Sequence, residues 1–174
     1  MTRLPVVEPS TCAPAQREAI DEWMSDRGQL HPPGALWRML VASPPSMRSI
    51  GKLGAFVRVG TSLDPLVQEV GALIASAERG FRFEVDIHEA KIRALDVDPE
   101  QVYRVGSGKP ASLPEAAESV AVLAYAMARG ERVDDAHVAT LVGLLGDEHL
   151  VEVITVIAYF LMIGDLARVL EPDV

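Results

Sequence analysis

The fold is decided by residues 64–95, which read DPLVQEVGALIASAERGFRFEVDIHEAKIRAL. The stretch begins with Asp64 followed by proline, and an N-cap residue before a proline at the first helical position is a typical helix start. Gly80 lies midway, where a turn between two helical patterns needs a residue that tolerates an unusual backbone. Because so short a turn joins the two patterns, we expect an antiparallel helical hairpin made of 64–79 and 81–96.

The sequence outside the hairpin also favours helices. Aromatic residues make up only 5% of the chain, and the β-branched alternation of half-buried strands is absent. Asp98 before proline repeats the helix start, while Ser112 and Glu115 fit a capping box. Glycines stand where helices are expected to end, namely at Gly80, Gly106, Gly130 and Gly146. The expected helices are 14–27, 34–42, 45–59, 64–79, 81–96, 99–105, 113–129, 134–145 and 148–170.

The chain is expected to form one all-α domain. Its 174 residues are typical of a single domain, and 49% apolar with 24% charged residues describe a globular core. The domain is expected to cover 14–174. An N-terminal arm, 1–13, precedes it and has no helical period, and 106–110 is expected to connect the front section to the last three helices.

The charge balance argues against several partners. The chain has 16 Lys+Arg and 25 Asp+Glu, so its formal charge is 16 − 25 = −9, and its cations are dispersed. Binding to phosphates requires clustered cations, so we expect neither nucleic acid nor an anionic membrane surface as a partner.

The most apolar stretch, 153–164, has 12 residues and falls short of the roughly 20 that a membrane-spanning helix needs. We expect a helix buried on nearly all sides, packed in part against another subunit. The alternative is the central core helix of a monomer.

Cysteine usage indicates a reduced compartment. Cys12 is the only cysteine, so the chain cannot form an internal disulfide, a CxxC pair or a cysteine-built zinc site. The first residues lack the apolar segment of a secretory leader, so we expect a cytoplasmic protein. Glu148, His149 and Glu152 cluster on one helix, but their order is wrong for a di-iron protein and fits a solvated helix start. We expect no metal site and no cofactor.

Polar residues lie on the inward face of the second hairpin helix. A rotation of about 100° per residue places one charged stripe toward solvent. This stripe contains Arg82, Asp86, Glu89 and Arg93. The opposite side contains Glu84, His88 and Lys91 among the apolar Phe81, Ile92 and Leu95. Unpaired burial of such groups is costly, so they must pair with each other, pair with another helix, or line a cavity.

A second inward carboxylate lies on the first hairpin helix. Glu69 stands beside its apolar seam, and the hairpin can bring it near Glu84 and His88, which are four residues apart and can meet directly. A purely structural alternative stays open. In it Glu69 lies at the edge of the core and reaches water, and Glu84 with His88 forms a satisfied core ion pair.

Glu69, His88 and the hairpin resemble the carboxymuconolactone decarboxylase and alkylhydroperoxidase D-like superfamily. The peroxidase branch has Glu, eleven residues, Cys, two residues, Cys, three residues and His. Here Glu69 and His88 keep that spacing, while Phe81 and Glu84 stand in place of the cysteines. The residues Phe83, Glu84 and His88 also resemble the aromatic-Glu-x-x-x-His variant of cysteine-free members.

The resemblance implies an all-α, multi-helix bundle of the alkylhydroperoxidase D-like type with a central hairpin, assembled into a homotrimer or homohexamer. It also implies a small-molecule substrate and an active site beside the hairpin. In thiol members Glu and His activate a cysteine. Thiol peroxidase activity is disfavoured here, because Cys12 lies outside the motif.

The decarboxylase branch implies acid–base chemistry on a small lactone or carboxylic acid. On that basis His88 is the general acid/base, Glu84 its orienting partner or second acid, and Glu69 a relay. Lys91 and Phe81 are weaker candidates for contacting the substrate. Two alternatives stay open: a peroxiredoxin-like antioxidant relative and a non-catalytic structural or interaction homologue. A cavity lined by the two glutamates and the histidine favours an enzyme, whereas tight pairing without a void favours the structural alternative.

Overall fold

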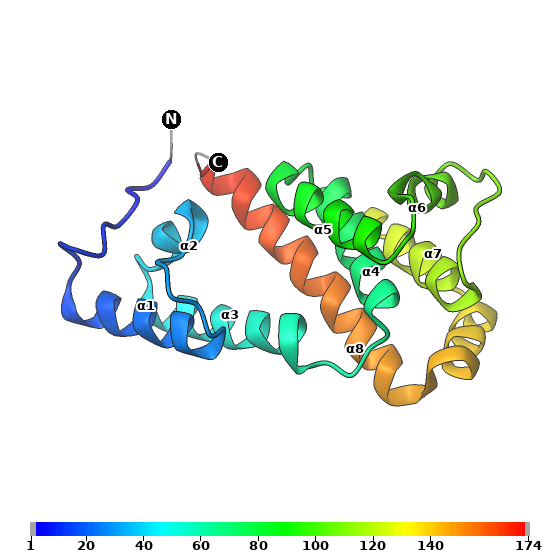
Figure 1. Cartoon of the computed structure of the whole chain (residues 1–174), viewed down its shortest axis with the longest axis horizontal. Coiled ribbons are helices and arrows are strands. Elements are labelled where there is room, and N and C mark those ends of the chain that lie inside the picture. Colours follow the sequence, from blue (N-terminus) through cyan, green and yellow to red (C-terminus); the bar gives the residue numbers. More distant parts are fainter. Residues whose placement is uncertain (1–2, 173–174) are drawn as a thin grey trace. The chain divides into compact units, whose positions relative to one another are not determined.

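The computed structural model describes residues 3–172 and forms two compact units. One unit runs up to Thr61 and resumes at Leu166, and the other is Ser62–Asp165. No residue between 3 and 172 belongs to a strand, so the all-α prediction is confirmed (Figure 1). The single domain from residue 14 stays a prediction, and Met1 and Thr2 of the expected arm lie outside the described residues.

The first unit contains the early helices of the chain. They are α1 (Pro14–Asp26), α2 (Ala35–Leu40), α3 (Pro44–Ala55) and the π-helical turn η1 (Phe56–Gly60). α1 packs against α3, and the rings of Trp23 and Trp37 lie 5.3 Å apart in the core of this unit. No helix forms between residue 3 and Pro14, and the Sγ of Cys12 donates to the carbonyl of Pro9.

The second unit is built around the predicted hairpin. Its elements are α4 (Pro65–Glu78), α5 (Arg82–Ala94), α6 (Pro99–Gly106), α7 (Glu115–Arg129) and most of α8 (Asp135–Leu170). The expected helices agree with the observed bounds to within two residues, once η1 is counted with α3 and the expected helices 134–145 and 148–170 are counted together as α8.

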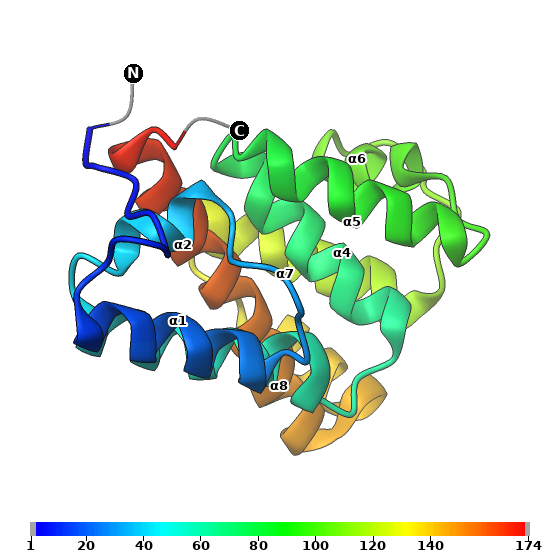
Figure 2. The same ribbon diagram turned by 60° about the vertical axis from the view of Figure 1, so that its left-hand side comes forward.

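Local signals start and end the hairpin helices. Oδ1 of Asp64 accepts hydrogen bonds from the backbone N–H groups of Leu66 and Val67, at 2.9 and 3.3 Å, so the predicted N-cap is confirmed. Gly80 then has a φ of 68°, which only glycine adopts without strain. The chain reverses there, and α4 and α5 lie side by side in Figures 1 and 2.

α4 is the central helix of this unit. Residues 69–76 are all buried, because α4 packs against both α5 and α7 (Figure 2). Gly71 allows α8 to approach closely, since a Cβ there would lie 3.1 Å from Cγ1 of Ile157.

α8 is covered on one face in this chain. Within 153–164 most residues are buried and Ile154 is 40% exposed, while Val151 just before this stretch is 64% exposed. One face of α8 packs on α4, and the opposite face remains at the surface. Cover of that face by another subunit stays a prediction. By length and composition alone α8 is able to span a membrane, and half of its most apolar window is buried. The absence of a membrane partner stays a prediction.

The capping box predicted at Ser112 does not form. The N-cap of α7 is Pro114, with an extended backbone and no side-chain hydrogen bond. The N–H of Ser112 donates instead to Oε1 of Gln101, which ties the loop to α6. The helix therefore starts beyond the reach of the Ser112 hydroxyl.

The predicted break at Gly146 is confirmed, and it provides a test of backbone strain. Gly146 has φ 79° and ψ 165° inside α8, a conformation essentially restricted to glycine. Gly146→Ala is expected to lower the free energy of unfolding by about 1–3 kcal/mol in urea denaturation. Gly143→Ala, in the same helix with open space around it, is the control and is expected to be neutral or slightly stabilising. Equal losses of unfolding free energy in the two variants would contradict a special backbone requirement at Gly146.

Candidate functional site

The hairpin brings two carboxyl groups against one imidazole. Glu69 comes from α4, while Glu84 and His88 come from α5, and their side chains are 8%, 6% and 2% exposed. Nδ1 of His88 lies 2.5 Å from Oε2 of Glu69, and Nε2 lies 3.5 Å from Oε2 of Glu84. The imidazole is therefore held between a close carboxyl group and a more distant one.

The first contact defines which groups carry protons. Burial raises the pKa of Glu69, but the hydrogen bonds and positive charges of His88 and Lys91 outweigh it and lower the pKa below its ordinary value. Glu69 is thus an ionised acceptor, and Nδ1 of His88 carries the hydrogen that it accepts.

The second contact is longer than the first. Nε2 of His88 lies 3.5 Å from Oε2 of Glu84, and this buried nitrogen makes no hydrogen bond to any described residue. A buried imidazole nitrogen without a hydrogen bond is unusual, and it is the atom through which the site is able to exchange a proton.

Lys91 lies at the solvent end of this chain of groups. Its Nζ is 2.8 Å from Oε1 of Glu69, but its side chain is 44% exposed. The prediction that Lys91 points into the core is therefore wrong, and so is the one for Leu95, which is 39% exposed. The long alkyl stem of Lys91 lets its ammonium group reach the buried carboxylate from the surface. The polar chain thus runs from solvent to the interior.

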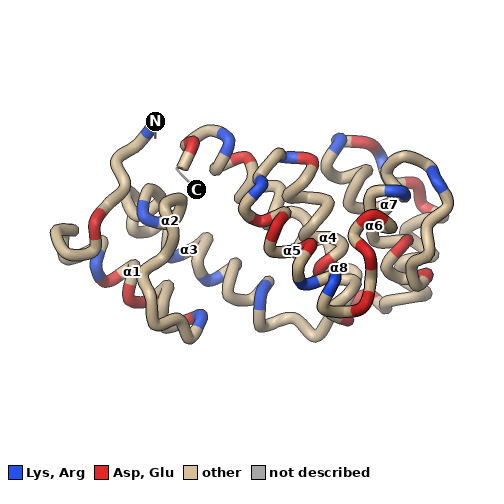
Figure 3. Tube along the Cα trace, turned by 45° about the horizontal axis from the view of Figure 1, so that its top comes forward, with Lys and Arg blue, Asp and Glu red and all other residues tan. Residues whose placement is uncertain are grey.

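The outer face of α5 is charged, as its spacing predicted. Arg93 pairs with Glu89 at 2.7 Å and Arg82 with Asp86 at 3.6 Å, and Figure 3 shows both acidic and basic residues along this helix. Tyr103 of α6 also donates to Glu89 at 2.8 Å. These surface pairs are separate from the buried chain.

Phe160 is a site residue that sequence reasoning missed. Its ring lies edge-on to the imidazole of His88, with centroids 4.6 Å apart, and Tyr159 lies edge-on to Phe160 in turn. Phe160 is 2% exposed and comes from α8. The apolar character of 153–164 was the only signal in the sequence, and it does not identify which residue meets His88.

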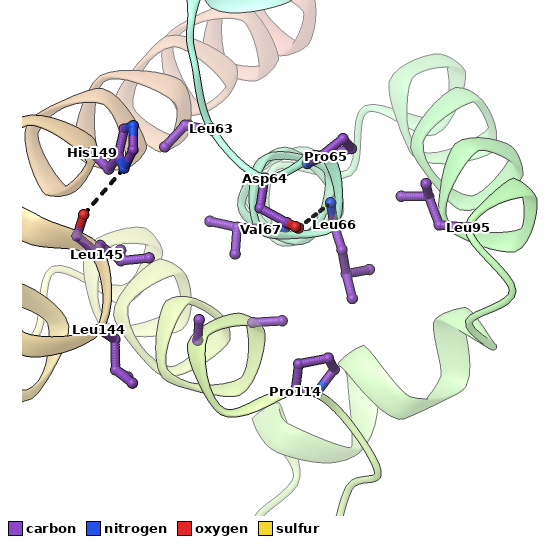
Figure 4. Close-up of a pocket in the computed structure, with 12 residues that line it drawn as sticks. Leu63, Asp64, Pro65, Leu66, Val67, Leu95, Pro114, Leu144, Leu145 and His149 are labelled. Atoms are coloured by element: carbon purple, nitrogen blue, oxygen red, sulfur yellow. Dashed lines mark hydrogen bonds between the residues drawn. The ribbon is translucent and has the colours of Figure 1, made fainter.

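Phe81 takes a structural position at the N-cap of α5. It is buried, and its ring lies 6.2 Å from that of Phe83. It does not line the cavity of about 470 Å³ shown in Figure 4, nor do Glu69, Glu84 and His88. The hairpin contributes Leu66 and Leu95 to that cavity instead.

The acidic cluster on α8 fixes a loop. His149 Nε2 lies 3.0 Å from the hydroxyl of Ser62, and Oε2 of Glu152 accepts from the N–H of Ser62 at 3.1 Å. Within residues 3–172 no group of three or more His, Cys, Asp or Glu is arranged to hold a metal ion. The sequence did not indicate Ser62 as the partner, because it lies far away along the chain.

The lowered pKa of Glu69 predicts a pH-dependent stability. A group whose folded pKa is depressed stabilises the fold above its unfolded pKa and loses that contribution as the pH falls through the folded pKa. The ordinary value is 4.5. The advantage of the native chain over Glu69→Gln in urea unfolding is therefore expected at neutral pH and should shrink below 4.5. A difference that stays constant through acid pH would contradict an ionised Glu69.

Comparison with solved structures identifies the fold. The debrominase Bmp8 in its apo form superposes with a TM-score of 0.70 and 14% identity, over 93% of this chain and 87% of Bmp8. A cysteine-to-alanine variant of Bmp8 in complex with 2,3,4-tribromopyrrole superposes with a TM-score of 0.72 and 14% identity, over 99% of this chain and 93% of the Bmp8 variant. No sequence-family model and no curated protein matches the chain. The chain thus has the alkylhydroperoxidase D-like fold that the hairpin motif predicted.

Proposed function

We propose that this chain is an enzyme of the carboxymuconolactone decarboxylase-like group, acting by acid–base chemistry on a small lactone or carboxylic acid. The observation that carries the proposal is the buried His88, held by Glu69 on one nitrogen and facing Glu84 at 3.5 Å on the other. A transferable proton in a buried site is what such a reaction requires. The shared fold with an enzyme supports the assignment.

The proposed reaction uses that proton once. The bond between the substrate carboxylate and its carbon breaks, the electron pair moves into the conjugated carbonyl, and carbon dioxide leaves. The resulting dienolate then takes a proton at carbon from the His88–Glu84 pair. Glu69 holds the other imidazole nitrogen, and Lys91 is the nearest cation for the substrate carboxylate. Phe81 is proposed as an apolar wall.

Thiol chemistry has little support in this chain. Glu84 and Phe81 occupy the positions of the family's cysteines, and Cys12 belongs to the other unit. Peroxide reduction through a hairpin thiol therefore has no nucleophile.

A non-catalytic homologue is the second candidate. Both imidazole nitrogens of His88 face carboxyl groups, and all three side chains are at most 8% exposed. A core ion-pair cluster has the same appearance, since buried charges survive only when paired. In that case changes at His88 alter stability alone.

The test is a substrate panel on the purified chain. Carboxymuconolactone and simpler γ-lactone carboxylates are assayed for release of carbon dioxide, beside an organic hydroperoxide. We expect decarboxylation of at least one lactone acid. Any peroxide turnover of the native chain should disappear in the Cys12→Ser variant. Peroxide turnover that survives Cys12→Ser, or a panel without any decarboxylation, would overturn the proposal.

We further propose a cytoplasmic homotrimer or homohexamer. The apolar surface of α8 around Val151 and Ile154 supports self-association, because exposed apolar surface of this kind typically lies at an interface.

A further inference from the structure

A concave apolar site lies at the end of the hairpin, away from the buried histidine. It is bounded by the first turn of α4, the end of α5, the start of α7 and the helical turn before Gly146 (Figure 4). Its volume of about 470 Å³ is within the range of small-molecule pockets. Ten of its twelve lining residues are apolar.

Part of this wall is open to solvent. Leu144 is 36% and Leu95 39% exposed, while Val67 and Ala117 form a buried floor. In Figure 4 the side chain of Leu66 projects into the space between α4 and Pro114. An apolar ring that fills this space would remove the leucine side chains from water.

Two polar residues line the cavity, and one of them is fully engaged. The Nδ1 of His149 lies 3.1 Å from the carbonyl oxygen of Leu145, which only accepts, so Nδ1 carries the hydrogen. Nε2 of the same ring is bonded to the hydroxyl of Ser62. His149 therefore braces the wall and has no ring nitrogen left for a ligand.

Asp64 provides the remaining polar group. Its Oδ1 caps α4, whereas its Oδ2 makes no hydrogen bond to any described residue. No lysine or arginine lines the cavity. Among its side chains, the site thus offers a negatively charged hydrogen-bond acceptor, which favours a donor and disfavours an anion beside Asp64.

We propose that this cavity binds a small, uncharged, mostly apolar molecule that donates an O–H or N–H to Asp64. The phenol class is the simplest that meets these conditions. The site is distinct from the one proposed for the lactone acid, because a carboxylate here would meet Asp64 without a compensating cation.

Methyl-detected NMR tests the proposal with three probes of similar size. Phenol carries a donor, anisole lacks one, and benzoate is an anion. We expect phenol to shift the methyl signals of Leu66 and Leu144, with affinity falling from phenol to anisole to benzoate. Benzoate binding as tightly as phenol, or shifts scattered over the surface, would overturn the proposal.

Asp64→Asn separates the ligand contact from folding. Asparagine caps a helix as well as aspartate does, but its free end donates instead of accepting. Phenol should bind about tenfold more weakly to this variant, while benzoate gains affinity. Asp98→Asn makes the same change at the N-cap of α6, outside the cavity, and should leave both affinities unchanged.

Ala116→Phe tests the cavity itself. Ala116 lines the pocket from the first turn of α7, and a phenyl ring there should displace both phenol and anisole. Retained binding of phenol in a folded Ala116→Phe variant would place the ligand elsewhere.

Discussion

Replacing His88 with alanine is expected to reduce turnover of the lactone acid by about 10²–10⁴-fold, the usual contribution of a general acid or base. The imidazole lies against both carboxyl groups of the buried cluster. Its removal also breaks the buried pair with Glu69, which typically costs about 3–5 kcal/mol of stability. Steady-state assays and urea unfolding measure the two effects separately.

Matched variants separate catalysis from stability at this position. Glu84→Gln keeps the size of the side chain but cannot act as an acid or base beside His88, so turnover should fall while the fold is retained. His31→Ala removes an exposed histidine of the other unit and should change neither quantity. A folded His88→Ala variant with full turnover would exclude His88 from the chemistry. Loss of stability alone, in an active protein, would favour the structural role.

Replacing Phe160 with alanine is expected to lower the free energy of unfolding by about 3–5 kcal/mol. Its ring is 2% exposed and lies edge-on to both His88 and Tyr159, so its removal leaves a cavity beside the imidazole. The loss is a large share of the about 5–15 kcal/mol that stabilises a typical domain. Chemical denaturation of the native chain and the variant measures it.

The control for Phe160 lies on the same helix. Val169 is 52% exposed, so Val169→Ala should change stability by no more than about 0.5 kcal/mol. Phe160→Leu retains most of the apolar volume but loses the ring edge, and it should lower turnover more than stability. If Phe160→Ala cost no more than Val169→Ala, the packing described around His88 would be wrong.

Signals that act over a few residues were predicted correctly. The Asp64 cap, the reversal at Gly80 and the break at Gly146 depend on local hydrogen bonds and on backbone conformations that glycine favours. The proximity of Glu84 and His88 is likewise a property of one helix. The box at Ser112 failed because a distant residue, Gln101, binds the loop that contains it.

Contacts between helices could be predicted from the sequence only in part. The Glu69–His88 bond follows from the hairpin, but the solvent exposure of Lys91 does not. The ring of Phe160 beside His88 and the bond between Ser62 and His149 join residues that are far apart along the chain. No periodicity within one segment specifies such a partner.

The sequence by itself therefore determined the helices, most of their ends and the inward positions of Glu69, Glu84 and His88, because each depends on interactions within about one helical turn. Only the tertiary structure decided which carboxyl group holds which nitrogen of His88, how far Lys91 reaches toward solvent, and that a cavity opens beside Asp64. These features depend on how side chains from several helices pack together, which no single segment of the sequence specifies.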